Sequence, residues 1–150
     1  MKGKYAENTE VSSDRSKSEI EKTLRKYGAK EFVSGWNDNQ AMILFSMEGR
    51  KVKFLLPLPP KSDFSKTETG RARKPNQIEE AYEQGIRQRW RALSLAIKAK
   101  LEMLECGIAI FDEEFLPYIV MPNGSTVAEE VIPKVKQAYL DGKQPQILIG

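Results

Sequence analysis

The spacing of apolar residues changes several times along the chain, and each change predicts a new element. Residues 1–15 are polar and lack periodicity, so we expect a loosely held, flexible tail. Overlapping capping boxes that begin at Ser16 predict a helix, and Gly28 is placed to end it in the left-handed conformation. The apolar stripe of this helix consists of Ile20, Leu24 and Tyr27.

Three strands are predicted to follow, over residues 32–36, 40–47 and 50–56. Turn-forming residues separate them, namely Asn37-Asp38-Asn39 and Glu48-Gly49. The second predicted strand is apolar at successive positions, which is typical of a central strand. The third alternates between apolar residues and residues expected to be partly exposed to solvent. We therefore expect an antiparallel meander.

A loop over residues 57–76 leads into a long helix over residues 76–106, with Asn76 as its N-cap and Gly107 as its stop. A loop of this length is usually either functional or disordered. The helix is apolar around most of its circumference, so it must pack on more than one side. We expect it to cover the sheet and then contact the C-terminal segment or another subunit, which predicts a homo-oligomer, either a dimer or a larger ring.

The last third predicts shorter elements: a helical turn over 112–115, a short strand over 118–121 and a helix that Thr126 opens with a capping box to Glu129. Together these patterns predict the α+β fold class. The expected order is a helix, a three-stranded antiparallel meander, a long helix and a short mixed C-terminal segment with a further helix, all in one domain over 16–150. The predicted inner face of the last helix consists of Val127, Val131, Val135 and Tyr139.

Composition narrows the class of protein. The chain has 150 residues, of which 40% are hydrophobic and 30% charged, as in one globular domain. We see no secretion signal and no membrane helix, and the single cysteine, Cys106, allows no internal disulfide, so the cytoplasm is expected. Cys106 itself reads as a small core residue. The chain has no histidine, which excludes Ser/His/Asp and Cys/His triads, and we predict no catalytic residue, cofactor or metal.

The distribution of basic residues matters more than the formal net charge of +3, which alone is too small to indicate nucleic acid. The loop and one stripe of the long helix are basic, and lysines mark one face of the third strand. Spaced cations of this kind are what phosphate contacts need. The competing interpretation is a solvated helix face with an i, i+4 pair between Glu83 and Arg87. The candidate nucleic-acid-binding residues are Arg71, Arg73, Lys74, Arg87, Arg91, Lys98, Lys51 and Lys53.

The order helix, three strands, helix is also that of double-stranded-RNA-binding domains and resembles the core of single-strand annealing proteins. It is equally the start of the restriction-endonuclease-like core, which would need carboxylates for Mg²⁺ and a lysine near the attacking water. Glu19, Asp38 and Glu48 are the acidic candidates, with Lys51 or Lys53. The fit is poor, because the acid–any–Lys triplet is missing from the third strand.

Acidic, cationic and aromatic residues near the apolar surfaces have structural interpretations as well. Asp112, Glu113 and Glu114 can bind a divalent ion, but such acids more often complement a helix dipole. Arg89 and Lys100 project toward the apolar arc of the long helix and are expected to snorkel or to pair with these carboxylates. Core packing is favoured for Trp36 and Trp90, although Trp36, beside a turn, is the better candidate for an exposed stacking residue.

Five segments, which together span almost the whole chain, carry a resemblance to known sequences. They are Tyr5-Ala6-Glu7-Asn8-Thr9, Ser16 through Ala29, Arg87-Gln88-Arg89-Trp90-Arg91-Ala92-Leu93, Ile97-Lys98-Ala99-Lys100-Leu101-Glu102 and Glu113-Glu114-Phe115. These segments resemble a family of small proteins encoded by bacteriophages and prophages. The resemblance implies a phage-derived protein in the host cytoplasm and carries no activity or catalytic residues.

Our hypothesis is a non-catalytic nucleic-acid-binding accessory protein of DNA or RNA metabolism. The alternatives are a metal-dependent nuclease and a protein–protein inhibitor of a host defence or replication factor, which would use the long helix and the apolar C-terminus.

Overall fold

The computed structural model describes the backbone of residues 2–146 and the side chains of residues 14–146. Its order of elements is the predicted one, so the α+β fold class is confirmed. The main elements are α1 (Lys2–Lys26), β1 (Glu31–Trp36), β2 (Gln40–Met47), β3 (Arg50–Pro57), α2 (Pro75–Glu105) and α4 (Val127–Asp141). Three short helices join them: η1 (Lys61–Phe64), α3 (Phe111–Phe115) and η2 (Leu116–Tyr118).

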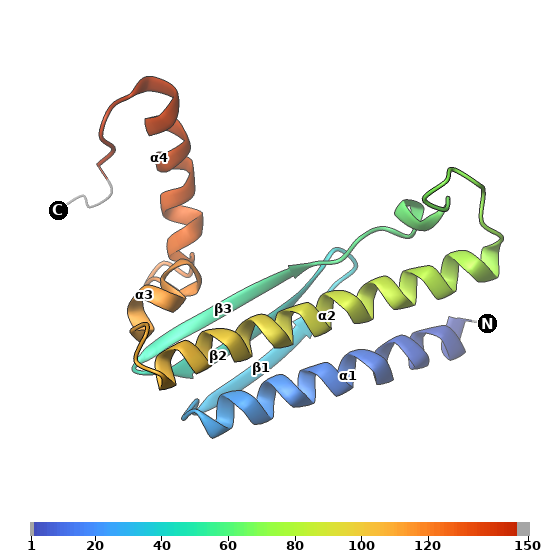
Figure 1. The fold of residues 1–150 in the computed structure, drawn as a ribbon, viewed down its shortest axis with the longest axis horizontal. Helices are drawn as coiled ribbons and strands as arrows, with labels where there is room; N and C mark the ends of the chain where they lie inside the picture. The colour runs from blue at the N-terminus through green and yellow to red at the C-terminus, as the bar shows by residue number, and fades with distance from the viewer. Residues whose placement is uncertain (1, 147–150) are drawn as a thin grey trace.

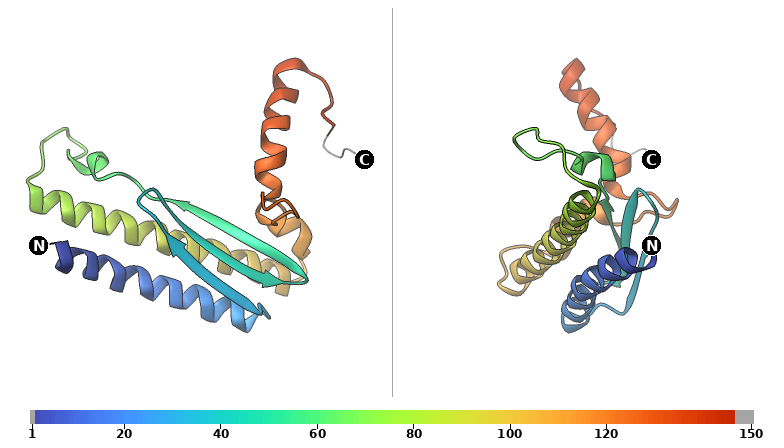
Figure 2. Two further views of the ribbon diagram at one scale, coloured as in Figure 1. Left: turned by 180° about the vertical axis from the view of Figure 1, so that it is seen from behind. Right: turned by 90° about the vertical axis from the view of Figure 1, so that its right-hand side faces the viewer.

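The strands form an antiparallel sheet in the order β1-β2-β3, and α1 and α2 lie side by side on one of its faces (Figures 1 and 2). Side chains alternate between the faces of a strand, and every second residue of β2 is buried under the helices. The opposite face carries Met42, Leu44, Lys53 and Leu55. The buried core residues of β2 and β3 are Ala41, Ile43, Phe45, Met47, Val52 and Phe54.

Helix α1 begins at Lys2, not at Ser16, so the region predicted to be a loosely held tail is helical in its backbone from residue 2 onward. A capping box marks where a helix can begin, but it does not stop a helix that has already formed upstream. Residues such as Lys4, Ala6 and Glu7 favour helix, and α1 packs along α2. The predicted end is confirmed, because Gly28 adopts a φ of 100°.

Helix α2 differs from its prediction only at the ends. Pro75 occupies the first turn and Lys74 is the N-cap, in place of Asn76, because the fixed φ of proline suits a first helical position. Gly107 has a φ of 76° and stops the helix as predicted. Cys106 is exposed, not buried, since the C-cap position points away from the packed face. No helix in the described part of the chain has the length and apolar character needed to cross a membrane.

The C-terminal ends of α1 and α2 are joined by a hydrogen bond from Tyr27 Oη to Glu105 Oε2 at 2.7 Å. This bond, together with burial and the nearby negative charges, raises the pKa of Tyr27 from 10.0 to about 12. The protonated phenol is therefore favoured in the folded state. Its contribution to stability is complete below the ordinary pKa and is lost as the pH rises through about 12.

We therefore expect Tyr27 to remain protonated at a pH where free tyrosine ionises. The measurement is an ultraviolet titration of the folded protein, compared with a Tyr27→Phe variant. The difference between the two curves isolates Tyr27 from the other four of the five tyrosines. A difference curve with its midpoint near pH 10 would show that the bond to Glu105 does not form in solution.

The segment after α2 returns to the sheet through Phe115, which is fully buried and lies edge-on to Phe45 and Phe54. Two ion pairs hold the same segment: Lys100 Nζ lies 3.1 Å from Glu114 Oε1, and Arg50 Nη2 lies 3.2 Å from Asp112 Oδ2. The predicted pairing of Lys100 with this acidic run is confirmed. Arg89 instead donates to the carbonyl oxygen of Gly85, one turn earlier in its own helix.

Helix α4 stands away from the rest of the molecule (Figures 1 and 2) and buries none of its residues. The predicted cap is confirmed, because Thr126 accepts a hydrogen bond from the Glu129 amide. The predicted inner face is wrong in the second half of the helix, where Tyr139 is 87% exposed and Val135 is 39% exposed. Val127 and Val131 are half-buried in the first half, where η2 contacts α4. Periodicity identified an apolar stripe, but no element of the described chain covers the rest of it.

The residues before α4 also differ from prediction. Leu116–Tyr118 form the helix η2, and only single bridges, from Ile119 to Val52 and from Val120 to Thr126, replace the predicted strand over 118–121. The following turn is fixed by Asn123 Nδ2, which donates to Glu130 at 2.7 Å and lowers the pKa of that carboxyl group. Residues Ile147, Leu148 and Ile149, named above as an apolar terminus, lie outside the described residues.

Candidate nucleic-acid interface

The loop before α2 folds back on the start of the helix. An isolated bridge joins Lys66 to Ala72, and Arg73 Nη1 donates to the carbonyl oxygens of Phe64 and Lys66, each at 3.1 Å. Arg73 therefore satisfies main-chain acceptors of its own loop. Its guanidinium group is a structural clamp, which leaves Arg71 and Lys74 as the exposed predicted cations here.

Phe64 anchors this loop at a close approach to Gly85. A Cβ atom at Gly85 would lie 2.6 Å from Cζ of Phe64, so only glycine allows the ring to rest on the helix. Phe64 also lies edge-on to Tyr82, and Lys61 pairs with Glu79 at 2.5 Å. The loop is thus a fixed platform at the start of α2, and its cations have defined positions relative to that helix.

Three of the predicted cations form one stripe on α2. At 100° per residue, Arg87, Arg91 and Lys98 point within about 40° of one another, with spacings of about 6 and 10 Å along the axis. All three are exposed, and none of them forms an ion pair with a carboxylate in residues 14–146. We call these three residues the α2 stripe.

The predicted pair between Glu83 and Arg87 is absent from the described residues. Glu83 is only 8% exposed and faces the interior, whereas Arg87 faces solvent. The i, i+4 spacing brings two residues to the same side of a helix, but 40° of rotation separates them, and here the edge of the buried face falls between them. The competing interpretation of the stripe therefore loses its main ion pair.

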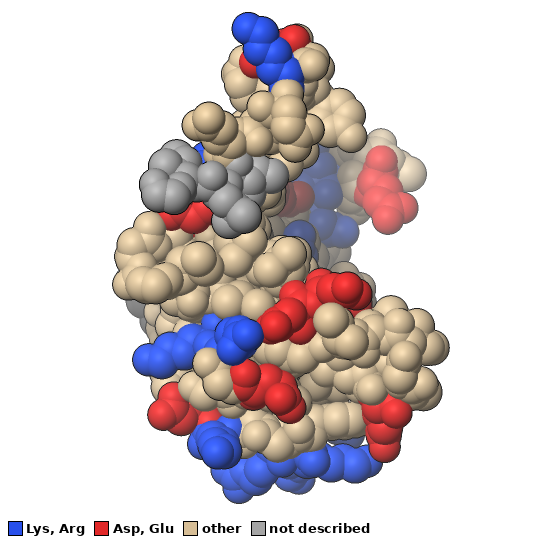
Figure 3. All heavy atoms as spheres, turned by 90° about the vertical axis from the view of Figure 1, so that its left-hand side faces the viewer, with Lys and Arg blue, Asp and Glu red and all other residues tan. Residues whose placement is uncertain are grey.

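Acidic residues limit the α2 stripe at both ends. Glu80 precedes it, and Glu102 and Glu105 follow it on the same side of the helix, so the basic stretch covers about 16 Å. Figure 3 shows Asp and Glu interspersed with Lys and Arg over the end of the molecule where α1 and α2 stop. The basic surface is therefore the middle of α2 and not its C-terminal end.

The two strand lysines belong to a different surface. Lys51 and Lys53 lie on the face of β3 that α1 and α2 do not cover, and Lys53 Nζ is 4.0 Å from Glu129 of α4. The structure therefore divides the eight predicted residues into three groups: Arg71, Arg73 and Lys74 in the loop, Arg87, Arg91 and Lys98 on α2, and Lys51 and Lys53 on the sheet.

The acidic candidates for a nuclease site do not converge. Asp38 and Glu48 lie in the turns at opposite ends of β2, roughly 27 Å of strand apart, and Glu19 is on the exposed side of α1. No three His, Cys, Asp or Glu residues of the described chain are close enough to hold a metal ion. Asp38 and Glu48 therefore cannot hold one Mg²⁺ ion between them in this arrangement.

The two tryptophans differ in their exposure to solvent. Trp90 is buried, with Lys17 Nζ 5.0 Å from its ring centroid, as core packing predicts. Trp36 is 65% exposed, so the core role favoured for it is wrong and the stacking role remains open. It ends β1, which has no neighbouring strand on its outer side within residues 2–146, and hydrophobic alternation alone does not reveal this.

Comparison of the chain with protein-family models, characterised proteins and solved structures finds no match.

Proposed function

We propose that the chain is a non-catalytic nucleic-acid-binding protein that acts as an accessory factor in DNA or RNA metabolism. The observation that supports it is the α2 stripe, since its arginines and lysine are exposed and have no carboxylate partner within residues 14–146, which leaves them available to phosphates. Arg71 and Lys74 form a second group of exposed cations at the start of α2, and Glu80 lies between them and the α2 stripe along the helix. The resemblance to small phage and prophage proteins supports a proposed action inside a bacterial host.

Contacts of this kind position a protein on the nucleic-acid backbone without reading its sequence. Three to five phosphate contacts are within reach of these cations. Binding is therefore expected to be weak to moderate, strongly dependent on salt and similar for different sequences.

The test is a titration of the protein into single- and double-stranded DNA and RNA of matched length. Binding is expected at ~50 mM salt and is expected to weaken steeply as the salt concentration rises. Absence of binding to all four probes at ~50 mM salt would falsify the proposal. The same probes, incubated with the protein and Mg²⁺ or Mn²⁺, are expected to remain intact, and metal-dependent cleavage by clean protein would revive the nuclease interpretation.

A protein–protein role, such as inhibition of a host defence or replication factor, is the second candidate. Helix α4 favours it, because Ile132, Tyr139 and Leu140 are exposed on an arm that stands off the body. Apolar side chains exposed together often mark a surface for another protein. The titration separates the two candidates. If the folded protein binds none of the four probes, the protein–protein role is the candidate that remains.

A further inference from the structure

The two edges of the sheet differ. The edge of β3 is partly covered, because Ile119 forms a bridge with Val52 and the Val120 amide donates to Lys51 at 2.8 Å. The edge of β1 has no strand beyond it in the described residues. An open edge presents unpaired amides and carbonyls, and natural proteins usually protect it with charges, prolines or bulges. From Phe32 to Trp36, β1 has neither a charged residue nor a proline.

The main chain of β1 shows which residues face that edge. The Asn37 amide donates to Gln40, its partner across the hairpin, at 2.8 Å. Bonds alternate along an antiparallel pair, so Gly35 and Val33 also bond to β2. The amides and carbonyls of the residues between them therefore point outward; these residues are Phe32, Ser34 and Trp36.

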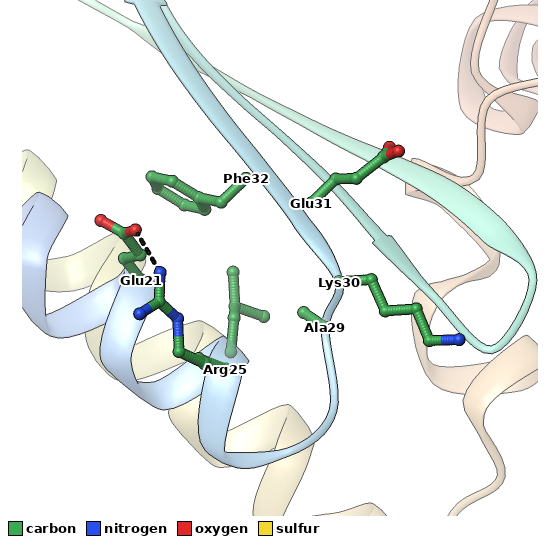
Figure 4. A pocket seen from close by; sticks show the side chains of 7 residues that line it. Glu21, Arg25, Ala29, Lys30, Glu31 and Phe32 are labelled. Atoms are coloured by element: carbon green, nitrogen blue, oxygen red, sulfur yellow. Dashed lines mark hydrogen bonds and ion pairs between the residues drawn. The ribbon is translucent and has the colours of Figure 1, made fainter.

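A pocket lies beside the open edge, between the end of α1 and the start of β1 (Figure 4). Its lining includes Leu24, Arg25 and Phe32, and Phe32 points toward α1 whereas Glu31 points away from it. Arg25 is held by Glu21 at 3.1 Å. The lining is mostly polar, and Leu24, Ala29 and Phe32 supply its apolar part beside the Arg25 guanidinium group. An aromatic ring can contact both an apolar side chain and a guanidinium group.

We propose that the occupant of this edge is a second copy of the chain, whose β1 pairs antiparallel with the first across a twofold axis at Ser34. The two sheets then form one continuous sheet, and each copy covers the open edge of the other. The twofold axis makes the contact isologous, so one surface patch must complement itself. The proposal is independent of nucleic-acid binding.

The sequence of β1 is self-complementary in this register. Phe32 lies opposite Trp36 of the second copy, on the face that carries the pocket, and the small Gly35 lies opposite Val33. Aromatic pairs across strands are among the stabilising ones. The exposed ring of Trp36 then lies beside the pocket of the other copy, next to Arg25. Beyond the strand, Lys30 comes near the turn that carries Asp38 of the second copy, which is a favourable pairing of charges.

Other registers fit less well. A shift of one residue would place the inner side chains of one copy on the outer face of the other. A shift of two residues, with the axis at Val33, would set Phe32 opposite Ser34 and Trp36 opposite Lys30. Only with the axis at Ser34 does Phe32 of each copy lie opposite Trp36 of the other. In the same register, the outward Ser34 amide of each copy points at the Ser34 carbonyl oxygen of the other.

The main test uses a pair of proline variants. Ser34→Pro removes an amide that faces outward, so the monomer fold is expected to survive while the dimer dissociation constant rises at least tenfold. Val33→Pro removes an amide that bonds to β2 and is expected to lower the melting temperature. Sedimentation velocity of the full chain from ~1 to ~200 µM measures association, and circular dichroism confirms folding. A wild-type protein that remains a monomer throughout, or a folded Ser34→Pro variant that dimerises like wild type, overturns the proposal.

Two further measurements report the register. In a Cys106→Ser background, Ser34→Cys is expected to cross-link with a thiol oxidant, because narrow pairs place Cα atoms ~5.5 Å apart, within disulfide range. Faster cross-linking of Val33→Cys would overturn the axis at Ser34. Trp36 fluorescence is expected to shift to longer wavelength on dilution, with buried Trp90 as a constant background. Emission that is independent of concentration while the dimer dissociates contradicts the proposed place of Trp36.

Discussion

Replacement of Phe115 by alanine is expected to lower the free energy of unfolding by about 3–5 kcal/mol. The side chain has no exposed surface and touches the sheet and the C-terminal segment at once: it lies edge-on to Phe45 and Phe54 and stacks on Phe111. Removal of the ring leaves a cavity between rigid layers that cannot collapse onto it. A loss of this size is a large share of the ~5–15 kcal/mol that stabilises a typical domain.

The matched control is Leu116→Ala at the next residue, which is exposed and is expected to cost less than about 1 kcal/mol. Urea denaturation at equilibrium, followed by circular dichroism, measures both variants against the wild type. Equal losses for the two variants would mean that the C-terminal segment does not pack on the sheet through Phe115. That result would also remove the anchor from which α4 projects.

Local sequence patterns were sufficient to predict most helices and strands, because the interactions that begin and end these elements involve residues close in sequence. The bounds of β2 follow from turn residues on either side of an apolar run, and Thr126 caps α4 through its own third neighbour. Gly28 and Gly107 end helices because positive φ is readily available to glycine. Each of these signals is complete in the sequence without knowledge of what packs against it.

The predictions that failed depend on contacts between distant segments. An apolar stripe on α4 indicates that something should cover it, but not that the covering surface is absent from the described chain. The exposure of Trp36 follows from the position of β1 at the edge, which requires the strand order. Cys106 is exposed because it lies at the C-cap of α2, where the helix ends. An error of one residue in the predicted end of a helix changes the expected direction of a side chain by 100°.

The candidate site shows the same division. Helical geometry alone predicts that Arg87, Arg91 and Lys98 share one side of α2, and they do. It does not predict that Arg73 is engaged by the carbonyls of Phe64 and Lys66, because the fold of that loop depends on Phe64 reaching Gly85. The sequence therefore predicted more phosphate-binding cations than the folded surface leaves free. The three residues of the α2 stripe are the predicted cations that are exposed together on one side of a helix.

The replacement of all three residues of the α2 stripe by alanine is expected to weaken nucleic-acid binding by roughly 10²–10³-fold at ~0.1 M salt. Each lost phosphate contact no longer releases a counterion, so the slope of log K against log salt should fall by about 2–3 in magnitude. The loss should be similar across sequences, since phosphate contacts carry no sequence information. Fluorescence anisotropy at four or more salt concentrations gives both quantities from one set of titrations.

The control must separate contacts from net charge, and the chain offers a matched set. Arg15, Arg50 and Lys61 are exposed cations that already pair with Glu19, Asp112 and Glu79. Their replacement by alanine lowers the formal charge from +3 to 0, as does replacement of the α2 stripe. Because their charges are already compensated locally, the slope is expected to change by less than about 1. If both triple variants lose the same affinity and slope, long-range attraction and not the α2 stripe accounts for binding.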